Sequence, residues 1–370
     1  MDTTQIYNVV NSVTEQALGG ELAAVNAEGL ISLGNVVLSS STNTEGWLNT
    51  LLQRIGRTII STRSYRNKLG DMVLNDFEYG AMLQKISFGM PDSEADQMFD
   101  ITDGKSVDMY TVKKPEVVQK LFYTRAPYQF HISTQRTLLK EAFLSEQGMG
   151  SFLAGCMEAV RNKLEYTLES LGRLTIANMI AEISVDTGRV FNLVTLYNAA
   201  SGETLTAANA MENPGFLRYA VATMNQVAKN FTDYNKGLYN NGEVERFTPF
   251  EMQRMKVISE FETKLETVVQ YSAFHENYVR LNAFQELNYW QSQEDRMAIN
   301  INRASNGTAT TVNNVVGILY DRDALGTYRR EEDVLTTPVN AAGAYYNTYW
   351  HMRELWFNDL SENAVYFTLN

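Results

Sequence analysis

Two aspartates one residue apart, Asp321 and Asp323, are the first candidates for chemistry in this chain of 370 residues. Closely spaced carboxylates suit Mg²⁺ or Ca²⁺, so the pair could hold a metal ion in a cytoplasmic α+β enzyme. However, the pair directly follows the apolar run 315–320, and Arg322 between the two acids would compete for them. We interpret the pair as the turn that ends a buried strand, and keep the metal site as the alternative.

The other reactive residue types are scattered along the chain. The histidines are His131, His275 and His351, and the single cysteine is Cys156. The histidines lie in extended or aromatic surroundings typical of structural residues, and Cys156 lies in an apolar helical stripe typical of a buried thiol. Residues 104–106 match only the Gly-Lys-Ser end of a phosphate-binding loop. No nucleophile stands with a base and an orienting group, so we predict no catalytic site, no metal site and no cofactor.

The elements that would position these residues indicate an α+β chain. Apolar residues at helical spacing predict a helix of some 30 residues that begins after Gly150 and ends near Ile183. Shorter predicted elements are a helix from Pro214, a strand at 255–258, a helix from Glu260 to about Tyr271 with a Ser259–Glu262 capping box, a buried strand at 315–320, and strands at about 346–357 and 364–369. No stretch approaches the ~20 apolar residues of a membrane span, so we expect no membrane partner.

Residues 72–90 and 107–132 are typical of extended chain and predict a long hairpin. Between them lies an acidic tip, whose acids are Asp92, Glu94, Asp96, Asp100, Asp103 and Asp108. The returning arm is basic, with Lys113, Lys114, Lys120 and Arg125. A two-stranded ribbon is marginally stable alone, so we expect this one to lie on its own domain or on a neighbouring subunit.

The net charge, 31 − 43 = −12, argues against a protein that coats nucleic acid. One local exception is a basic strip without acids between Gly46 and Gly70. It consists of Arg54, Arg57, Arg63, Arg66 and Lys68. A solvated surface or contact with a nucleic-acid backbone are alternatives, but we expect the strip to meet carboxylates, on an adjacent subunit or on its own chain.

Five segments carry a resemblance to a known family: Arg54–Ile60, Gln119–Tyr123, Leu205–Met211, Gly317–Gly326 and Phe357–Asn363. In these segments and in its order of elements, the chain resembles a tailed-bacteriophage major capsid protein of the Hong Kong 97 type. The resemblance covers nearly the whole chain. It implies an α+β, Hong Kong 97-like capsid fold and a structural protein that is not an enzyme.

The resemblance also implies a division of the chain. An N-terminal arm would occupy residues 1–65, an extended loop 66–130, a peripheral domain with a long spine helix 131–187, an axial domain 188–344, and C-terminal strands that return to the peripheral domain 345–370. Some relatives cross-link a Lys to an Asn, but no residue here matches that pair. Residues 1–45 are short for a cleaved scaffolding segment, which suggests a separate scaffold or none.

The implied function is self-assembly, as hexamers and pentamers, into the icosahedral shell around phage double-stranded DNA, with no sequence-specific DNA binding. The protein would be made in the bacterial host cytoplasm and reside in the virion, where scaffold, portal and cement proteins are possible partners. The acidic tip and the basic strip would make contacts between subunits. The alternatives are an encapsulin-type compartment shell, which has the same fold, and the enzyme with an Asp321/Asp323 metal site.

Overall fold

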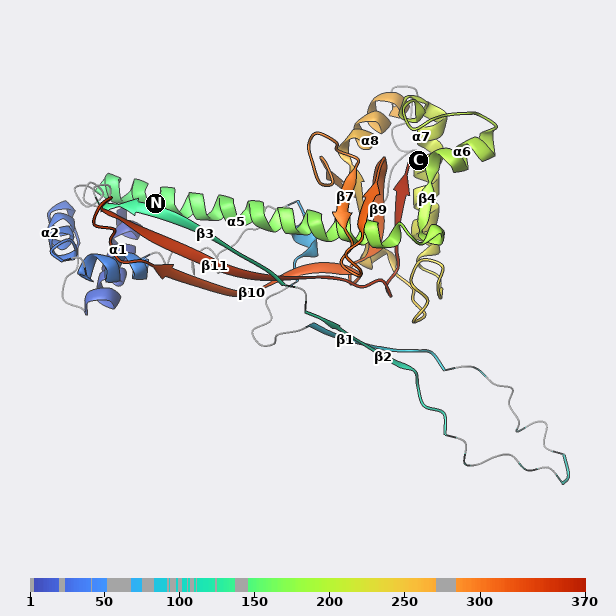
Figure 1. Cartoon of the computed structure of the whole chain (residues 1–370), viewed down its shortest axis with the longest axis horizontal. Coiled ribbons are helices and arrows are strands. Elements are labelled where there is room, and N and C mark those ends of the chain that lie inside the picture. The colour runs from blue at the N-terminus through green and yellow to red at the C-terminus, as the bar shows by residue number, and fades with distance from the viewer. Residues whose placement is uncertain are drawn as a thin grey trace.

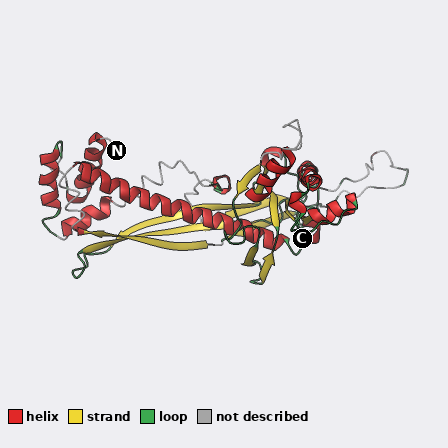
Figure 2. Ribbon diagram, turned by 90° about the horizontal axis from the view of Figure 1, so that it is seen from above, coloured by secondary structure: helices red, strands yellow, loops and turns green. Residues whose placement is uncertain are grey.

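The computed structural model describes residues 3–19, 24–40, 42–51, 68–74, 83–91, 93, 98, 102–104, 106, 110, 112–123, 125–136, 146–270 and 284–370. In outline, a long helix and a long sheet run side by side between a small helical cluster at one end and an α+β body at the other (Figures 1 and 2).

The long helix is α5, Glu146–Ile183, whose 38 residues span about 57 Å at 1.5 Å per residue. Its apolar stripe is buried as the spacing predicts, with Val160, Leu164, Leu168 and Leu171 all at most 7% exposed. The helix begins a few residues before the predicted start and ends at the predicted residue. Cys156 lies within it.

The sheet beside α5 has three antiparallel strands in the order β10–β11–β3. These strands are β10 (Leu325–Thr336), β11 (Tyr345–Asn358) and β3 (Arg125–Gln135). Along β11 the side chains alternate between buried and partly exposed, and Phe130 of β3 stacks on Trp350 of β11 at 5.4 Å between ring centroids. The predicted C-terminal strand at about 346–357 is therefore confirmed.

The N-terminal residues form helices α1 (Thr3–Leu18) and α2 (Ala27–Val37) and a further helical stretch over residues 42–51. Helices this short are marginal alone, and the structure supplies their neighbours. Trp47 is fully buried and donates its indole N–H to Thr14 at 3.0 Å. These helices share one core with Val160, Leu164 and Leu168 of α5 and with Phe130, Tyr346 and Trp350 of the sheet.

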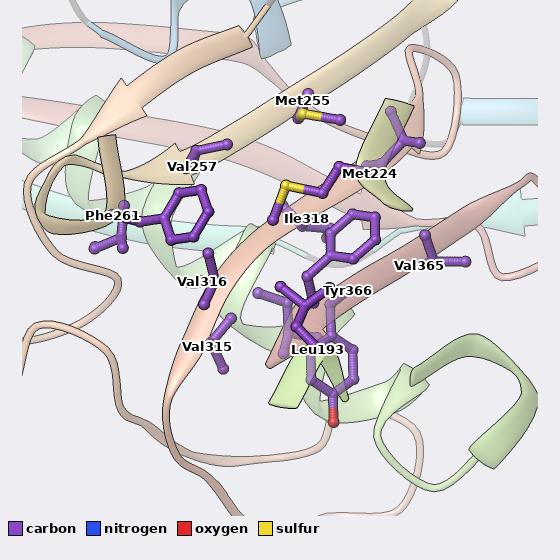
Figure 3. Close-up of a cluster of buried hydrophobic side chains, with 14 of the residues drawn as sticks. Leu193, Met224, Met255, Val257, Phe261, Val315, Val316, Ile318, Val365 and Tyr366 are labelled. Atoms are coloured by element: carbon purple, nitrogen blue, oxygen red, sulfur yellow. The ribbon is translucent and has the colours of Figure 1, made fainter. Parts of the chain in front are cut away.

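The α+β body is built on a five-stranded sheet in the order β4–β12–β9–β5–β6. Its strands are β4 (Val190–Asn192), β12 (Ala364–Thr368), β9 (Val315–Asp321), β5 (Gln253–Ile258) and β6 (Phe284–Leu287). The central strand β9 is buried along its whole length, as its continuous apolar run predicts. Met224 of α7 (Pro214–Asn230), Phe261 of α8 (Ser259–Lys264) and strands β5, β9 and β12 build the core shown in Figure 3.

Three helices and one small hairpin complete the body: α6 (Leu193–Ser201), α7 (Pro214–Asn230), α8 (Ser259–Lys264), β7 (Ile299–Asn302) and β8 (Ala309–Val312). The predicted cap of α7 is confirmed, since the side chain of Asn213 accepts hydrogen bonds from the amides of Gly215 and Phe216. The predicted capping box at Ser259 is wrong. Ser259 is itself the first helical residue, and Ile258 at the cap position has no side chain that can accept a hydrogen bond.

The chain is helical over residues 259–270, close to the helix predicted from Glu260 to about Tyr271, but its second half is not regular α-helix. Regular α-helix ends at Lys264, and a π-helical turn follows over Leu265–Gln270. The remaining short elements are the 3₁₀ turns Gly70–Met72, Thr187–Arg189, Ala210–Glu212 and Phe250–Met252.

The predicted hairpin is present as strands β1 (Leu83–Phe88) and β2 (Val117–Phe122), which pair antiparallel. They leave the molecule near the junction of the long sheet and the α+β body, and β2 leads directly into β3 (Figure 1).

Candidate functional site at the base of the hairpin

The two strands of the hairpin form a ribbon with two different faces. Side chains alternate between the two faces along each strand, and each residue of β1 lies on the same face as the residue of β2 directly opposite it. Lys85 lies directly opposite Lys120 on the more buried face. Like charges directly opposite each other destabilise a sheet, so this pair requires a counter-charge.

That counter-charge is Asp359, in the turn between β11 and β12. Its side chain is 0% exposed, with Oδ2 2.8 Å from the Nζ of Lys85 and Oδ1 3.2 Å from the Nζ of Lys120. One carboxylate therefore pairs with two lysines of the ribbon, one through each oxygen. The exposed Glu243 lies 2.6 Å from Lys120 as a further partner.

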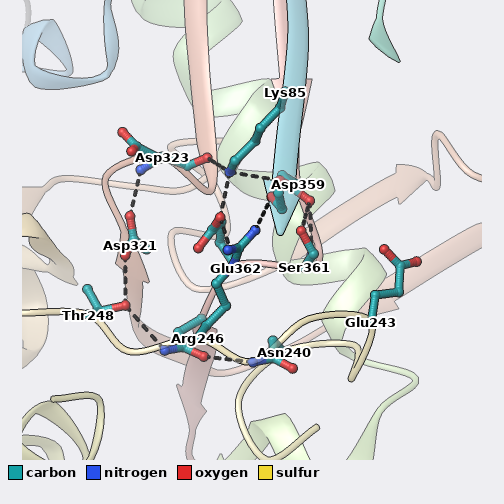
Figure 4. Close-up of polar contacts among 12 residues, drawn as sticks. Lys85, Asn240, Glu243, Arg246, Thr248, Asp321, Asp323, Asp359, Ser361 and Glu362 are labelled. Atoms are coloured by element: carbon teal, nitrogen blue, oxygen red, sulfur yellow. Dashed lines mark hydrogen bonds and ion pairs between the residues drawn. The ribbon is translucent and has the colours of Figure 1, made fainter. Parts of the chain in front are cut away.

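A second carboxylate of the same turn, Glu362, extends the ion cluster (Figure 4). Its Oε1 lies 2.7 Å from the Nζ of Lys85 and 3.0 Å from the Nε of Arg246. Arg246 in turn donates a 2.5 Å hydrogen bond from Nη2 to the hydroxyl of Ser87 on β1. Lys85 also donates to the main-chain oxygen of Asp323 at 3.1 Å. The base of the ribbon is thus tied to three separate segments of the body.

The turn that carries Asp359 is held by its own hydrogen bonds. Ser361 donates its amide and its hydroxyl to Oδ1 of Asp359, at 3.0 and 2.6 Å. The side chain of Asn363 donates to Thr248, and Asn240 donates to Asn363, so the loop 233–250 is joined to the turn. The bonds from Ser361 thus orient the Asp359 carboxylate independently of the lysines.

The environment shifts the titration of several of these groups. Burial would raise the pKa of Asp359, but the charges of Lys85 and Lys120 and the hydrogen bonds to Lys85 and Ser361 outweigh it and lower the pKa to about 2. Burial would lower the pKa of Lys85, yet Asp359 and Glu362 raise it. The pKa of Glu362 is raised, because burial outweighs the stabilising charges of Lys85 and Arg246. Asp359 is therefore firmly ionised at neutral pH.

Asp321 and Asp323 form the predicted strand-ending turn. Oδ1 of Asp321 accepts the amide of Asp323 at 2.8 Å, and Oδ2 accepts the hydroxyl of Thr248 at 2.7 Å. Burial raises the pKa of Asp321, and the exposed Asp323 lies 3.2 Å from Arg322. Both carboxylates have protein partners, and across the described residues no three His, Cys, Asp or Glu side chains gather in a way that could hold a metal ion.

The opposite face of the ribbon is apolar and open. Ile86, Phe88, Val117 and Leu121 alternate with the residues of the ion cluster and are 51%, 65%, 51% and 47% exposed. Such a run of exposed apolar side chains on one face marks a contact surface.

Of the residues predicted to make contacts between subunits, the structure describes Lys68 and Asp103. Lys68 donates to the side chain of Asn288 at 3.1 Å, and Asp103 is exposed. The others lie outside the described residues, as does His275; they are Arg54, Arg57, Arg63, Arg66, Asp92, Glu94, Asp96, Asp100 and Asp108. Among the other histidines, His131 and His351 flank the ring of Tyr349 on the long sheet.

Sequence reasoning missed the ion cluster, although its residues lie in segments that it had quoted. Lys120 lies in Gln119–Tyr123, Asp323 in Gly317–Gly326, and Asp359 and Glu362 in Phe357–Asn363. Three of the five segments that carry the capsid resemblance therefore meet at the base of the hairpin. Nothing in the sequence pointed to Lys85 and Arg246, because the partner of an isolated basic residue cannot be identified from its neighbours in the chain.

The same segments also pack tightly. A Cβ on Gly326 would lie 2.8 Å from the ring of Phe357 and 3.2 Å from the main-chain oxygen of Met72. Phe357 in turn lies 5.1 Å from Phe122 of the ribbon, between ring centroids. The glycine thus lets β10, β11 and the segment that leads into the hairpin approach one another.

Comparisons with known proteins bear on this arrangement. The family model for Phi29-like phage major capsid proteins matches residues 8–368. The major capsid protein of Bacillus phage B103 is 24% identical over 241 residues, and that of Bacillus phage GA-1 is 23% identical over 369 residues. These alignments cover 64% and 98% of this chain, but only 50% and 69% of the relatives' own lengths.

Among solved structures, a chain from the capsid of Staphylococcus phage Andhra is similar, with a TM-score of 0.51 and 10% sequence identity. The match covers 81% of this chain and 83% of that one, and it shows a shared mixed helix-and-sheet fold. Within the described residues, no helix has the length and apolar character needed to cross a membrane.

Proposed function

The chain belongs to the family of Phi29-like phage major capsid proteins, and we propose that its copies assemble into the icosahedral shell of a phage head. The observation that carries the proposal is the family match over residues 8–368, together with a fold shared with a phage capsid chain. Self-assembly makes the protein a component of the virion, made in the cytoplasm of the bacterial host. We assign it a structural role and no catalytic one.

The proposed arrangement is that of the Hong Kong 97 type. Residues 66–130 would be the extended loop, α5 with the three-stranded sheet the peripheral domain, and the five-stranded body the axial domain. In support, α5 and the sheet lie side by side over their length, while the five-stranded sheet has its own core. We place the N-terminal helices, which we assign to the arm over 1–65, at the far end of the peripheral domain.

In the shell, the hairpin would lie on a neighbouring copy. Its inner face is occupied by contacts with its own chain, and its outer face carries four exposed apolar side chains, so a second copy is the natural cover for that face. Hexamers and pentamers would repeat this contact around each ring as a heterologous interface that closes. The carboxylates of the acidic tip on one copy would then pair with the basic side chains of the strip on the next, and these pairs would fix the register between copies.

The shell would enclose double-stranded DNA without binding it by sequence. A net charge of −12 opposes condensation of the chain on phosphates, which suits a wall that confines DNA. Scaffold, portal and cement proteins are further partners in this proposal. An encapsulin-type shell and an enzyme with an Asp321/Asp323 metal site find no support in the comparisons or in the contacts of those two aspartates.

Electron microscopy of the purified protein tests the proposal. Closed shells of uniform diameter are the expected result. A protein that stays monomeric or forms small open oligomers at high concentration would contradict it.

A further inference from the structure

We propose that the Asp359 carboxylate is the positioning residue of the hairpin, holding the ribbon in one direction relative to the body before it meets a second copy. The part of this inference that concerns the second copy rests on the proposed shell function. The part that concerns the direction of the hairpin rests on contacts within one chain.

The hairpin is attached to the body without help from either hydrophobic core. Among the described residues, none of β1 or β2 belongs to the core of the α+β body or to the core around the N-terminal helices. Its described side-chain attachments are the ion cluster, the bond from Arg246 to Ser87, and the contact of Phe122 with Phe357. A two-stranded ribbon is marginal by itself, so these few contacts decide both its direction and its stability.

Within this set, Asp359 has the central place. It alone among the described carboxylates contacts both Lys85 and Lys120, which face each other across the ribbon. Without it, Glu362 would have to serve both Lys85 and Arg246, and Lys120 would keep only the exposed Glu243. Three basic groups would then face two carboxylates, and their repulsion would drive the ribbon away from the turn. The other partner of Lys120, Glu243, lies 2.6 Å away but is 45% exposed, so solvent weakens that ion pair.

Asp359→Asn tests the positioning role with little change of shape. The asparagine keeps an oxygen for the amide and hydroxyl of Ser361, so the turn can remain folded while the charge is lost. Hydrogen exchange of the unassembled subunit is the readout. We expect the amides of residues 83–88 and 117–122 to exchange at least about tenfold faster, while those of β9 and α5 stay unchanged.

Three further variants complete the test, and the first of them, Lys85→Gln, keeps it decisive if Asp359→Asn does not fold. Lys85→Gln alters only the ribbon, outside both cores, and we expect the same local acceleration. Glu243→Gln is the matched control, because it removes the exposed partner of Lys120 and should change exchange by less than about threefold. Adding Lys85→Met and Lys120→Met to Asp359→Asn should recover part of the protection, since it removes the repelling charges.

Unchanged exchange at 83–88 and 117–122 in both Asp359→Asn and Lys85→Gln would overturn the proposal. Acceleration that is equal in the ribbon, β9 and α5 would also overturn it, because it would make Asp359 a residue of the general fold.

Assembly supplies the second readout, and we expect Asp359→Asn to lower shell yield by at least about tenfold at equal protein concentration. A loosened ribbon with normal shell yield would refute the positioning role and leave the proposed shell function intact. Absence of shells from the unaltered protein would refute the proposed function instead, while the exchange experiment would still judge the attachment of the ribbon.

Discussion

Lys85 and Lys120 lie directly opposite each other on adjacent antiparallel strands, and their ammonium groups share the two oxygens of Asp359. A single buried carboxylate from the C-terminal turn thus holds two like charges together. We call the three residues Lys85, Lys120 and Asp359 the clamp. The relationship connects a local feature of strand pairing to the direction of the whole hairpin.

The clamp should lose its contribution in acid. The pKa of Asp359 is depressed to about 2 in the folded chain, so its stabilisation is fully present above the unfolded value of 3.8 and disappears as pH falls through about 2. The lowering of the pKa from 3.8 to about 2 corresponds to about 2 kcal/mol of unfolding free energy. Urea unfolding of the unaltered chain and of Asp359→Asn should therefore differ by that amount at pH 6 and converge near pH 2.

Glu362 and Asp321, whose pKa values are raised, also titrate between pH 6 and pH 2. Because both proteins contain them, the difference in stability between the two proteins reports on Asp359. A stability difference that stays constant from pH 6 to pH 2 would show that the charge of Asp359 is not what stabilises the chain.

Glu262 should act in the opposite direction. Burial, together with the charges of Glu266 and Glu286, raises its pKa to about 7. A carboxyl whose folded pKa exceeds its unfolded value costs stability as pH rises from about 4.5 through 7. Glu262→Gln should therefore be more stable than the unaltered chain at pH 8, by on the order of 1 kcal/mol after solvent screening, and equal to it at pH 4.

Thermal melts at the two pH values measure this effect. The exposed Glu251→Gln is the control and should leave the melting temperature unchanged at both. A lower melting temperature for Glu262→Gln at pH 8 would mean that the ionised carboxylate has a stabilising partner.

Gly326 should tolerate no side chain. A methyl group there would meet the ring of Phe357 at 2.8 Å and the main-chain oxygen of Met72 at 3.2 Å, so Gly326→Ala should cost about 1–3 kcal/mol. Gly46 lies in a helical stretch with nothing within 4 Å of the added atom. Gly46→Ala should be neutral or gain up to about 1 kcal/mol, and equal effects at both sites in chemical unfolding would refute the packing argument.

The apolar outer face of the ribbon should matter for assembly and not for folding. Phe88 is 65% exposed in the single chain, so Phe88→Gln removes little that the subunit needs. We expect normal circular dichroism, a normal melting temperature and a shell yield reduced at least about tenfold. Gln84→Ser, on the same face, is the control that should assemble normally, and normal yield from Phe88→Gln would show that this face stays uncovered.

Local pattern predicted the elements whose signal is self-contained. The stripe of α5, the buried run of β9 and the cap at Asn213 each follow from neighbouring residues, and each is present. The capping box at Ser259 failed because the chain enters α8 directly from β5, so the serine becomes helical before it can cap.

The ion cluster could not be predicted in the same way. Lys85 and Asp359 are 274 residues apart, and only the folded sheet brings them within 2.8 Å. The contacts predicted from the sequence were those of the acidic tip and the basic strip, because a run of like charges can be recognised within a single segment. A single lysine opposite another lysine becomes visible only once the register of β1 and β2 is known.

Electron cryo-microscopy of assembled particles tests the central claim most directly. The account predicts a closed icosahedral shell in which the outer face of each hairpin, at Ile86, Phe88, Val117 and Leu121, is covered by a neighbouring copy, while Asp359 still holds Lys85 and Lys120 of its own chain. Particles in which that face lies open to solvent or against its own body, or a purified protein that forms no shell, would contradict it.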